Sequence, residues 1–201
     1  MHSSPTTSLL EALKKATRPM HDATEAVAFA KEMKDGTLSL ANYQHLLNSN
    51  FYIHQSLETA FNTLLNKLSN NPLKDFVDNK SLWLEKDMDL INIQSKRSIF
   101  TSIIPPSYDD LASLIGGLYV VEGSMLGGRF IVKLLQKNPS LKTIPSFHFY
   151  SGYGASTGQR WSVFQDLAIR TLSSPQEFEV AIEKAKATFV FFQQVYETDL
   201  A

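Results

Sequence analysis

The chain has 201 residues, 43% of them hydrophobic, with a formal net charge of −1 and a pI near 6.5. This is enough chain for one domain with a hydrophobic core, and the balanced charge argues against a nucleic-acid-binding protein. The absence of cysteine excludes disulfides, thiolate metal sites and cysteine nucleophiles.

Neither the N-terminus nor the most apolar stretch near the middle of the chain indicates a secretory or membrane-spanning segment. The N-terminal stretch MHSSPTTSLLEALKKATRP has no apolar signal core. The apolar run LIGGLYVV is too short to span a bilayer and leads into Glu122. We therefore expect a cytoplasmic protein, a single domain over residues 1–201, and a disordered N-terminus over residues 1–7.

Helical spacing of apolar residues begins near the N-terminus. Ser8 and Glu11 form a capping-box pattern, and apolar residues then recur at helical spacing as far as Val27. Pro19 is expected to bend or split this first helix, because proline removes a backbone donor. A long helix follows over residues 40–68, and the sequence SNNP ends it.

The second half of the chain continues in the same pattern. After the weaker segments LKDFV and SLWLEKDMDLI, Ser107 as the cap and Asp110 as the third-position acid mark the start of a helix that reaches Gln136. Residues 137–157 are predicted to be loop. Two helices then close the chain, over 157–172 and from Pro175 to the end, the last capped by Ser174. With no convincing strand pattern, the sequence predicts an all-α domain of seven or eight helices.

The helix that ends near Gln136 contains an unusual number of glycines. Five of the nine glycines in the chain lie within residues 116–128, and each interior glycine costs a helix roughly 0.5–1 kcal/mol relative to alanine. One explanation is close packing against a neighbouring helix. The other is a flat ligand on the exposed backbone of Gly123 and Gly127, which are four residues apart and share a face, with a kink at the paired glycines.

Of the five histidines, none forms a metal-binding pair by spacing. His45 and His54 are nine residues apart, His148 lies in an aromatic loop that favours a structural hydrogen bond, and His2 is at the chain end. His21 lies on a half-apolar helix face, where a lone histidine is more often a boundary residue than a ligand. The H-E-x-x-H pattern, paired E-x-x-H patterns and the G-x-S-x-G elbow are all absent from the sequence.

Four segments together resemble the heme oxygenase family, particularly the bacterial branch that accompanies phytochromes. LKKATRPMHDATE is similar to the proximal helix of that family, and LYVVEGSMLGGRFI to its glycine-kinked distal helix. YGASTGQRWSVF and AKATFVFFQQVY are similar to later segments of the bacterial branch. The similarity extends from Leu9 to Tyr196 in matching order and spacing, and it implies an all-α fold in which heme is sandwiched between the two helices.

The resemblance implies roles for particular residues. His21 is the expected axial ligand of the heme iron, and the backbone of Gly123 and Gly127 is expected to face bound dioxygen. The implied catalytic residues are His21, Gly123, Ser124 and Gly127. The implied heme-binding residues are Lys14 and Arg160 at the propionates, together with His21, Tyr119, Gly123, Gly127, Gly128 and Phe189.

The implied activity is oxidative cleavage of heme to biliverdin, ferrous iron and carbon monoxide. Heme is both substrate and cofactor, dioxygen is consumed, and an external reductase of the ferredoxin or flavoprotein type supplies electrons. A phytochrome is a possible recipient of the bilin. Many family members have an aspartate where this chain has Ser124, so the proton route is open, and Arg129 or Glu122 contributes to it if either points inward.

Two alternatives stand beside this reading. The thiaminase-like hydrolases share the helical architecture but depend on a cysteine, which this chain lacks. The second alternative is a non-catalytic protein of the same fold, which holds heme without degrading it or serves as a helical module.

Overall fold

The computed structural model describes residues 5–68, 71–77 and 80–198, and these form helices without any strand. The first half contains α1 (Pro5–Val27), α2 (Ala30–Asp35), α3 (Leu40–Leu65) and α4 (Lys80–Leu90). The second half contains α5 (Leu111–Ser124), α6 (Gly128–Lys137), α7 (His148–Ser151), α8 (Thr157–Thr171) and α9 (Pro175–Tyr196). Short 3₁₀ turns lie at Pro72–Phe76, Arg97–Phe100, Met125–Gly127, Pro139–Leu141 and Gly154–Ser156.

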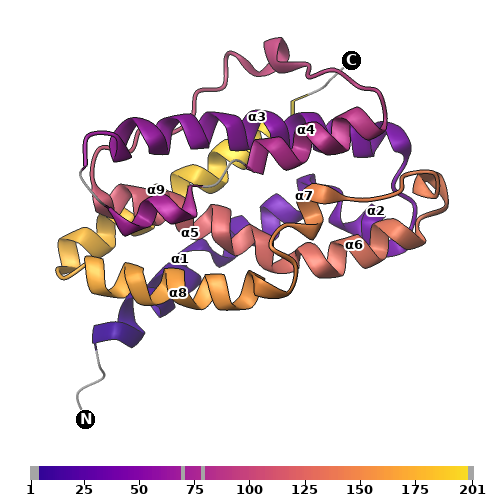
Figure 1. Cartoon of the computed structure of the whole chain (residues 1–201). Coiled ribbons are helices and arrows are strands. Elements are labelled where there is room, and N and C mark those ends of the chain that lie inside the picture. Colours follow the sequence, from indigo (N-terminus) through magenta and orange to yellow (C-terminus); the bar gives the residue numbers. More distant parts are fainter. Residues whose placement is uncertain (1–4, 69–70, 78–79, 199–201) are drawn as a thin grey trace.

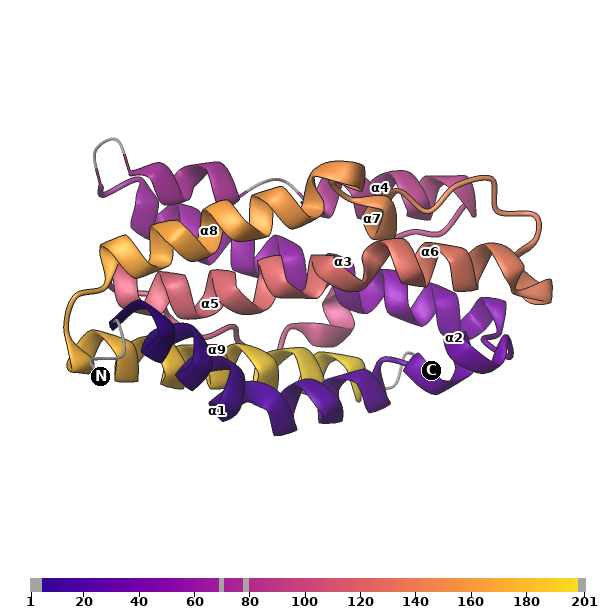
Figure 2. The same cartoon turned by 90° about the horizontal axis from the view of Figure 1, so that it is seen from below.

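The helices stack in layers around α5 and α9 (Figure 1). The long helix α3 and its neighbour α4 lie along one side of this pair, while α1 and α8 lie along the other. Helix α9 packs against both α5 and α1. Ten of the fourteen residues of α5 are buried, so α5 is the central element of the core and α1 and α8 flank it (Figure 2).

The stretch Leu111–Lys137 is long and apolar enough to cross a membrane by length and composition alone. Its most apolar window is 67% buried inside the protein, and the helix is interrupted by the 3₁₀ turn Met125–Gly127. Apolarity on all sides is typical of a helix surrounded by other helices in a core. Its composition is explained by this central position.

Several helix boundaries match the sequence predictions and several differ. Ser174 accepts from the Glu177 amide in a full capping box, as predicted. The cap of α5 is Asp110, paired with Ser113, whereas Ser107 bonds only to the neighbouring Asp109 carboxylate. The predicted loop over 137–157 contains α7 and two 3₁₀ turns.

The first helix also begins earlier than predicted. It starts at Pro5 and continues unbroken through Pro19, so the Ser8 pattern lies within its first turn rather than at its start. Proline is tolerated here without a split, although it supplies no amide hydrogen bond. Of the N-terminus expected to be disordered, residues 5–7 are helical and residues 1–4 lie outside the described residues.

Candidate functional site

His21 lies on the exposed side of α1 with its imidazole accessible. The side chain is 51% exposed, Nδ1 lies 3.5 Å from Asp22 Oδ1, and Nε2 lies 4.0 Å from Glu25 Oε1. On its inner side the ring meets Phe189 of α9 at a centroid distance of 6.2 Å. An accessible imidazole with carboxylates close to both nitrogens can ligate a metal with one nitrogen and be oriented through the other.

A contact between Thr17 and Tyr119 joins α1 to α5 one turn before His21. Burial raises the pKa of the Tyr119 phenol, and a hydrogen bond with Thr17 opposes that rise. Both helices run from left to right in Figures 1 and 2. His21 and Gly123 each follow the contact by four residues, one helical turn. The contact therefore brings His21 and the glycine segment to the same end of the α1–α5 pair.

The five clustered glycines separate into two groups according to what a Cβ atom would meet. At Gly116 it would meet the Ala181 carbonyl of α9, and at Gly128 the Tyr150 carbonyl. At Gly117 it would lie 2.6–2.9 Å from the rings of Tyr108 and Phe61. Helix and loop packing accounts for these three glycines, because backbone and rings occupy the space that a side chain needs.

Gly123 and Gly127 belong to the other group. A Cβ atom on Gly123 would lie 3.6 Å from the Trp161 ring, an ordinary contact, and one on Gly127 would lie 3.8 Å from Ile131 Cδ1. Packing against the described residues does not require glycine at either position. The pair instead leaves bare backbone on one face of the helix, where a flat ligand can approach closely.

The expected kink lies between these two residues and the following helix. Helix α5 ends at Ser124, the turn Met125–Gly127 is 3₁₀, and α6 begins at Gly128. The tighter turn changes the direction of the helix around the bare backbone.

Ser124 and Lys14 are both exposed, with different surroundings. The Ser124 hydroxyl donates to the Val121 carbonyl at 2.8 Å, so its proton bonds within its own helix. Lys14 lines an open depression of about 500 Å³ with Glu11, Lys15, Arg18 and Pro19. Its ammonium is placed to attract an anionic group of a ligand bound along α1.

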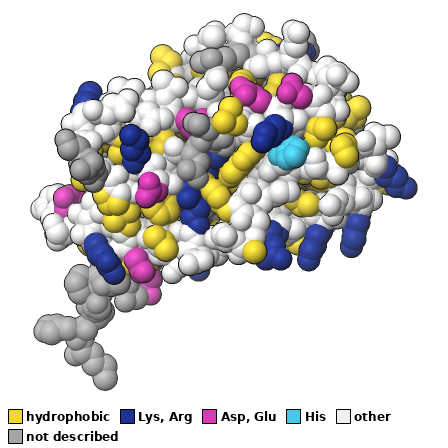
Figure 3. Space-filling view, in the orientation of Figure 1, with side chains coloured by type: hydrophobic (Ala, Val, Ile, Leu, Met, Phe, Trp, Pro, Cys, Tyr) yellow, Lys and Arg dark blue, Asp and Glu magenta, His cyan; other side chains and the backbone are white. Residues whose placement is uncertain are grey.

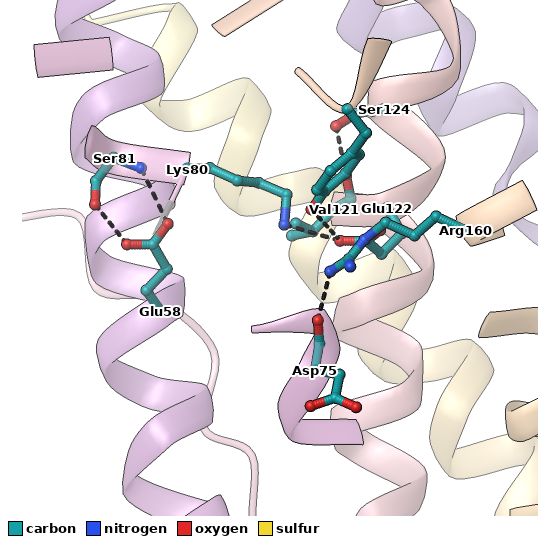
Figure 4. Close-up of polar contacts among 9 residues, drawn as sticks. Glu58, Asp75, Lys80, Ser81, Val121, Glu122, Ser124 and Arg160 are labelled. Atoms are coloured by element: carbon teal, nitrogen blue, oxygen red, sulfur yellow. Dashed lines mark hydrogen bonds and ion pairs between the residues drawn. The ribbon is translucent and has the colours of Figure 1, made fainter. Parts of the chain in front are cut away.

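Arg160 does not face this depression. Its Nε donates to Glu122 Oε2 at 2.9 Å, and its Nη2 donates to the Asp75 carbonyl at 2.7 Å (Figure 4). The guanidinium also lies over the rings of Tyr153 and Phe76, with 4.2 and 4.8 Å to their centroids. In this structure the guanidinium joins α8 to α5 and to the turn at Asp75, and the propionate contact of Arg160 stays a prediction.

Glu122 is the centre of this polar cluster and is 2% exposed. Its Oε1 accepts from Lys80 Nζ at 2.8 Å and from the Tyr153 hydroxyl at 3.2 Å. Lys80 is itself only 1% exposed. Glu122 thus points inward, but toward three donors of the core rather than toward the glycine face, while Arg129 is exposed. Lys80 could not be identified from the sequence, because helical spacing does not distinguish a buried lysine from a surface one.

The other described histidines lie in hydrogen-bonded or buried positions. His45 Nε2 lies 2.9 Å from the Tyr196 carbonyl, and His148 Nε2 lies 3.1 Å from the Ser146 hydroxyl. Burial, and then the Lys80 charge, lowers the pKa of His54 to about 3. His2 lies outside the described residues. Within the described part of the chain, no three His, Asp or Glu side chains gather as a metal site.

Lys and Arg side chains form a row along the lower right edge of the face in Figure 3, over α6. Helix α6 contributes three exposed cations, Arg129, Lys133 and Lys137. The exposed Phe130 lies between them in sequence. A cationic edge with an apolar side chain is suited to contact with an acidic protein surface.

Comparison with known proteins connects this geometry to one family. The sequence model of the heme oxygenase family matches residues 7–198. The chain is 34% identical to a heme oxygenase from Xanthomonas campestris pv. campestris (strain 8004) over 90 residues, 44% of this chain and 53% of that relative. The match thus spans about half the length of the curated relative.

Three solved structures share the fold. A heme oxygenase from Leptospira interrogans has a TM-score of 0.72 at 18% identity, covering 94% of this chain and 98% of that one. The NO- and CO-bound enzyme from Neisseria meningitidis has a TM-score of 0.69 at 20% identity, covering 94% and 89%. Heme oxygenase-1 from Synechocystis sp. PCC6803, in complex with heme, has a TM-score of 0.67 at 16% identity, covering 94% and 90%. The predicted all-α fold is confirmed.

Proposed function

The chain belongs to the heme oxygenase family, and on that premise we propose that it cleaves heme oxidatively to biliverdin, ferrous iron and carbon monoxide. The observation that carries the proposal is the pairing of an accessible imidazole with bare helix backbone. His21 is half-exposed on α1, and packing does not require glycine at Gly123 or Gly127 on the kinked α5–α6 segment.

The residues present fit a planar, anionic porphyrin. The absence of side chains at Gly123, beside the Trp161 ring, and at Gly127 allows a flat ring to come close to the backbone. Phe189 offers an apolar wall beside His21, and Tyr119 offers a half-buried ring on α5. Lys14 lies in the open depression along α1, where its ammonium is suited to a propionate carboxylate.

Each residue then has a distinct task. His21 would hold the iron through one ring nitrogen, and a neighbouring carboxylate, Asp22 or Glu25, would orient the ring through the other. Bound heme supplies both the metal at which dioxygen is reduced and the ring that is cleaved. Gly123 and Gly127 would leave room for dioxygen and water at the bound heme, because neither residue has a side chain.

The proton route in this chain differs from one based on a distal aspartate. Ser124 bonds to the Val121 carbonyl, and Glu122 is engaged with Lys80 and Arg160. We propose that water held by the backbone of the glycine segment delivers the protons. The alternative to this proposal is a protein that binds heme but does not degrade it.

We further propose that the protein acts in the cytoplasm, with electrons from a ferredoxin- or flavoprotein-type donor, and that a phytochrome receives the bilin. The exposed cations of α6 support an acidic donor. Turnover with such a donor should fall as salt is raised, since salt screens contacts between exposed charges beyond about 8–10 Å. Turnover with a small chemical reductant should not.

The decisive experiment is titration of the purified protein with hemin, followed by reductant and dioxygen. A saturable one-to-one Soret band, its decay, and the appearance of biliverdin and carbon monoxide are expected. A stable one-to-one complex that yields no biliverdin under the same conditions would instead establish the non-catalytic alternative. Absence of a saturable Soret band would overturn both.

A further inference from the structure

Helices α5 and α8 meet through two adjacent residue pairs. On the buried side, Arg160 of α8 bonds to Glu122 of α5 at 2.9 Å. On the open side, Trp161 of α8 lies against Gly123 of α5, with its Cη2 atom 3.6 Å from the position that a Cβ would occupy. The Trp161 ring also contacts Tyr119, at a centroid distance of 5.5 Å. Trp161 is thus the aromatic side chain placed directly beside the bare backbone.

The contact between Trp161 and Gly123 does not by itself fix the position of α8 along α5. Gly123 has no side chain to interlock with the indole, so the ring would remain in van der Waals contact after a small shift of α8 along α5. The buried pair supplies the missing constraint, because a hydrogen-bonded ion pair depends on distance and direction more steeply than an apolar contact does.

Arg160 is held in one place from several directions (Figure 4). Besides Glu122, it binds the Asp75 carbonyl at 2.7 Å, and its guanidinium is 4.2 Å from the Tyr153 ring centroid. Glu122 in turn accepts from Lys80 of α4 and from Tyr153. The cluster therefore ties α5 to α4, to α8 and to the segment before α8 through one carboxylate.

Stability alone does not account for such a cluster. A buried ion pair is often no more stabilising than an apolar group of the same volume, because both charges lose their hydration. What a converging set of charged hydrogen bonds adds is a defined position. Here the defined position is that of Arg160, whose chain neighbour carries the indole that faces Gly123.

We propose that Trp161 is a wall of the substrate cleft beside Gly123 and that Glu122 is the positioning residue that places it, through Arg160. The proposal rests on the proposed function in taking a flat porphyrin as the occupant. An indole at this point offers an apolar aromatic surface to the ring. It also limits how far the ring can move along α5, so it acts on both affinity and orientation.

The chain contains two tryptophans, so Trp83→Phe leaves Trp161 as the sole fluorescent indole. In this background and without heme, Arg160→Met should raise the acrylamide quenching of Trp161 and shift its emission to longer wavelength. Lys80 and Glu122 remain paired in that variant, so it should fold. Arg160→Lys should restore part of the wild-type quenching, and Glu122→Gln should act in the same direction as Arg160→Met.

The matched control is Tyr196→Phe, which removes a buried 2.8 Å hydrogen bond to Asn50 far from α8 along the chain. It should lower the melting temperature without changing the quenching of Trp161. If Arg160→Met leaves the quenching at its wild-type value, or if Tyr196→Phe raises it equally, the positioning role is overturned.

The wall itself is tested by Trp161→Ala, which should bind hemin about tenfold more weakly than wild type. Unchanged hemin affinity in Trp161→Ala would overturn the wall. Failure of the proposed function has a different signature: wild type would bind no hemin, while the heme-free quenching of Trp161 would still respond to Arg160→Met.

Discussion

His21 of α1 meets Phe189 of α9 edge-on, with ring centroids 6.2 Å apart and ring planes at 71°. This contact limits the imidazole on its inner side and leaves the other side to a ligand. We expect His21→Ala to lose the axial-ligand spectrum of bound heme and to produce no biliverdin, with unchanged helical content, because the side chain is half-exposed. Absorption spectra of the hemin complex and circular dichroism measure the two properties.

The control for this prediction is His45→Ala, which removes a ring hydrogen bond to the Tyr196 carbonyl at a site away from the glycine segment. The iron spectrum of this variant should match that of wild type. If His21→Ala makes biliverdin at the wild-type rate without added imidazole, another group ligates the iron.

Lys14 and Arg160 were both predicted from the sequence as propionate partners, and the structure separates them. Lys14→Gln should weaken heme binding by about tenfold or more, since a charge-assisted hydrogen bond contributes roughly 1.5–3 kcal/mol. The melting temperature of the heme-free protein should not change, because Lys14 is exposed. Calorimetry of the heme-free protein together with hemin titration checks both statements.

Arg160→Gln, in contrast, should lower the melting temperature of the heme-free protein. Its loss leaves part of the Glu122 carboxylate without its 2.9 Å partner, and breaking a buried ion pair costs about 3–5 kcal/mol at full burial. Because the Arg160 side chain is 20% exposed, we expect the lower part of that range. An unchanged melting temperature would contradict the inward role of this guanidinium.

The fold follows largely from local sequence signals. Capping residues such as Ser174 and the glycine pair at 127–128 mark helix ends and the kink, because their effects are confined to one or two turns. The start of α5 was less clear, since Ser107 was predicted as the cap with Asp110 as its third-position acid, whereas Asp110 itself caps the helix and Ser113 is its partner in the capping box.

The site was predictable only in part, for a physical reason. The sequence does not distinguish Gly116 from Gly123, since both are glycines within a helix. In the structure, the Ala181 carbonyl occupies the space of a side chain at Gly116, whereas a Cβ at Gly123 would make an ordinary van der Waals contact with an indole ring. Arg160 looks like a surface cation, and Lys80 gives no pattern at all. Which residue points where depends on contacts between helices far apart in the chain, and periodicity within one helix does not carry that information.

Acid stability gives a further prediction through His54. Burial and then the Lys80 charge lower the pKa of His54 to about 3, so between pH 6.5 and 3 the unfolded state binds the proton more readily than the folded state. The contribution is present above about pH 6.5 and is lost as the pH falls toward 3, at up to about 1.4 kcal/mol per pH unit.

His54→Leu removes this titration while retaining an apolar side chain between Phe149 and Phe192, whose rings lie 5.0 and 6.1 Å from the imidazole. Denaturant unfolding of both proteins at pH 7 and pH 5 should show a smaller loss in the variant. Burial raises the pKa of the Glu58 and Asp87 carboxyls, which acts in the opposite direction, but in both proteins equally. Parallel pH profiles would exclude His54 as the group responsible.

The final prediction compares two neighbouring glycines. Gly127 has ordinary helical dihedrals, φ −74° and ψ −16°, and a Cβ there would lie 3.8 Å from Ile131 Cδ1, so leucine fits the heme-free protein. Gly127→Leu should leave its melting temperature equal or higher, since leucine favours a helix by nearly 1 kcal/mol. Biliverdin yield should be lost, because the side chain occupies the space beside the bare backbone.

Gly128→Ala should behave in the reverse way. Its Cβ would meet the Tyr150 carbonyl, and overpacking of this kind costs about 1–3 kcal/mol, a fall of roughly 2–4 °C in melting temperature for each kcal/mol. Fully folded Gly128→Ala should still produce biliverdin, because its added methyl points to the Tyr150 backbone rather than to the bare face at Gly127. Melting curves and biliverdin yield from the same preparations decide between the two accounts. A destabilised Gly127→Leu that turns over heme normally would assign both glycines to packing.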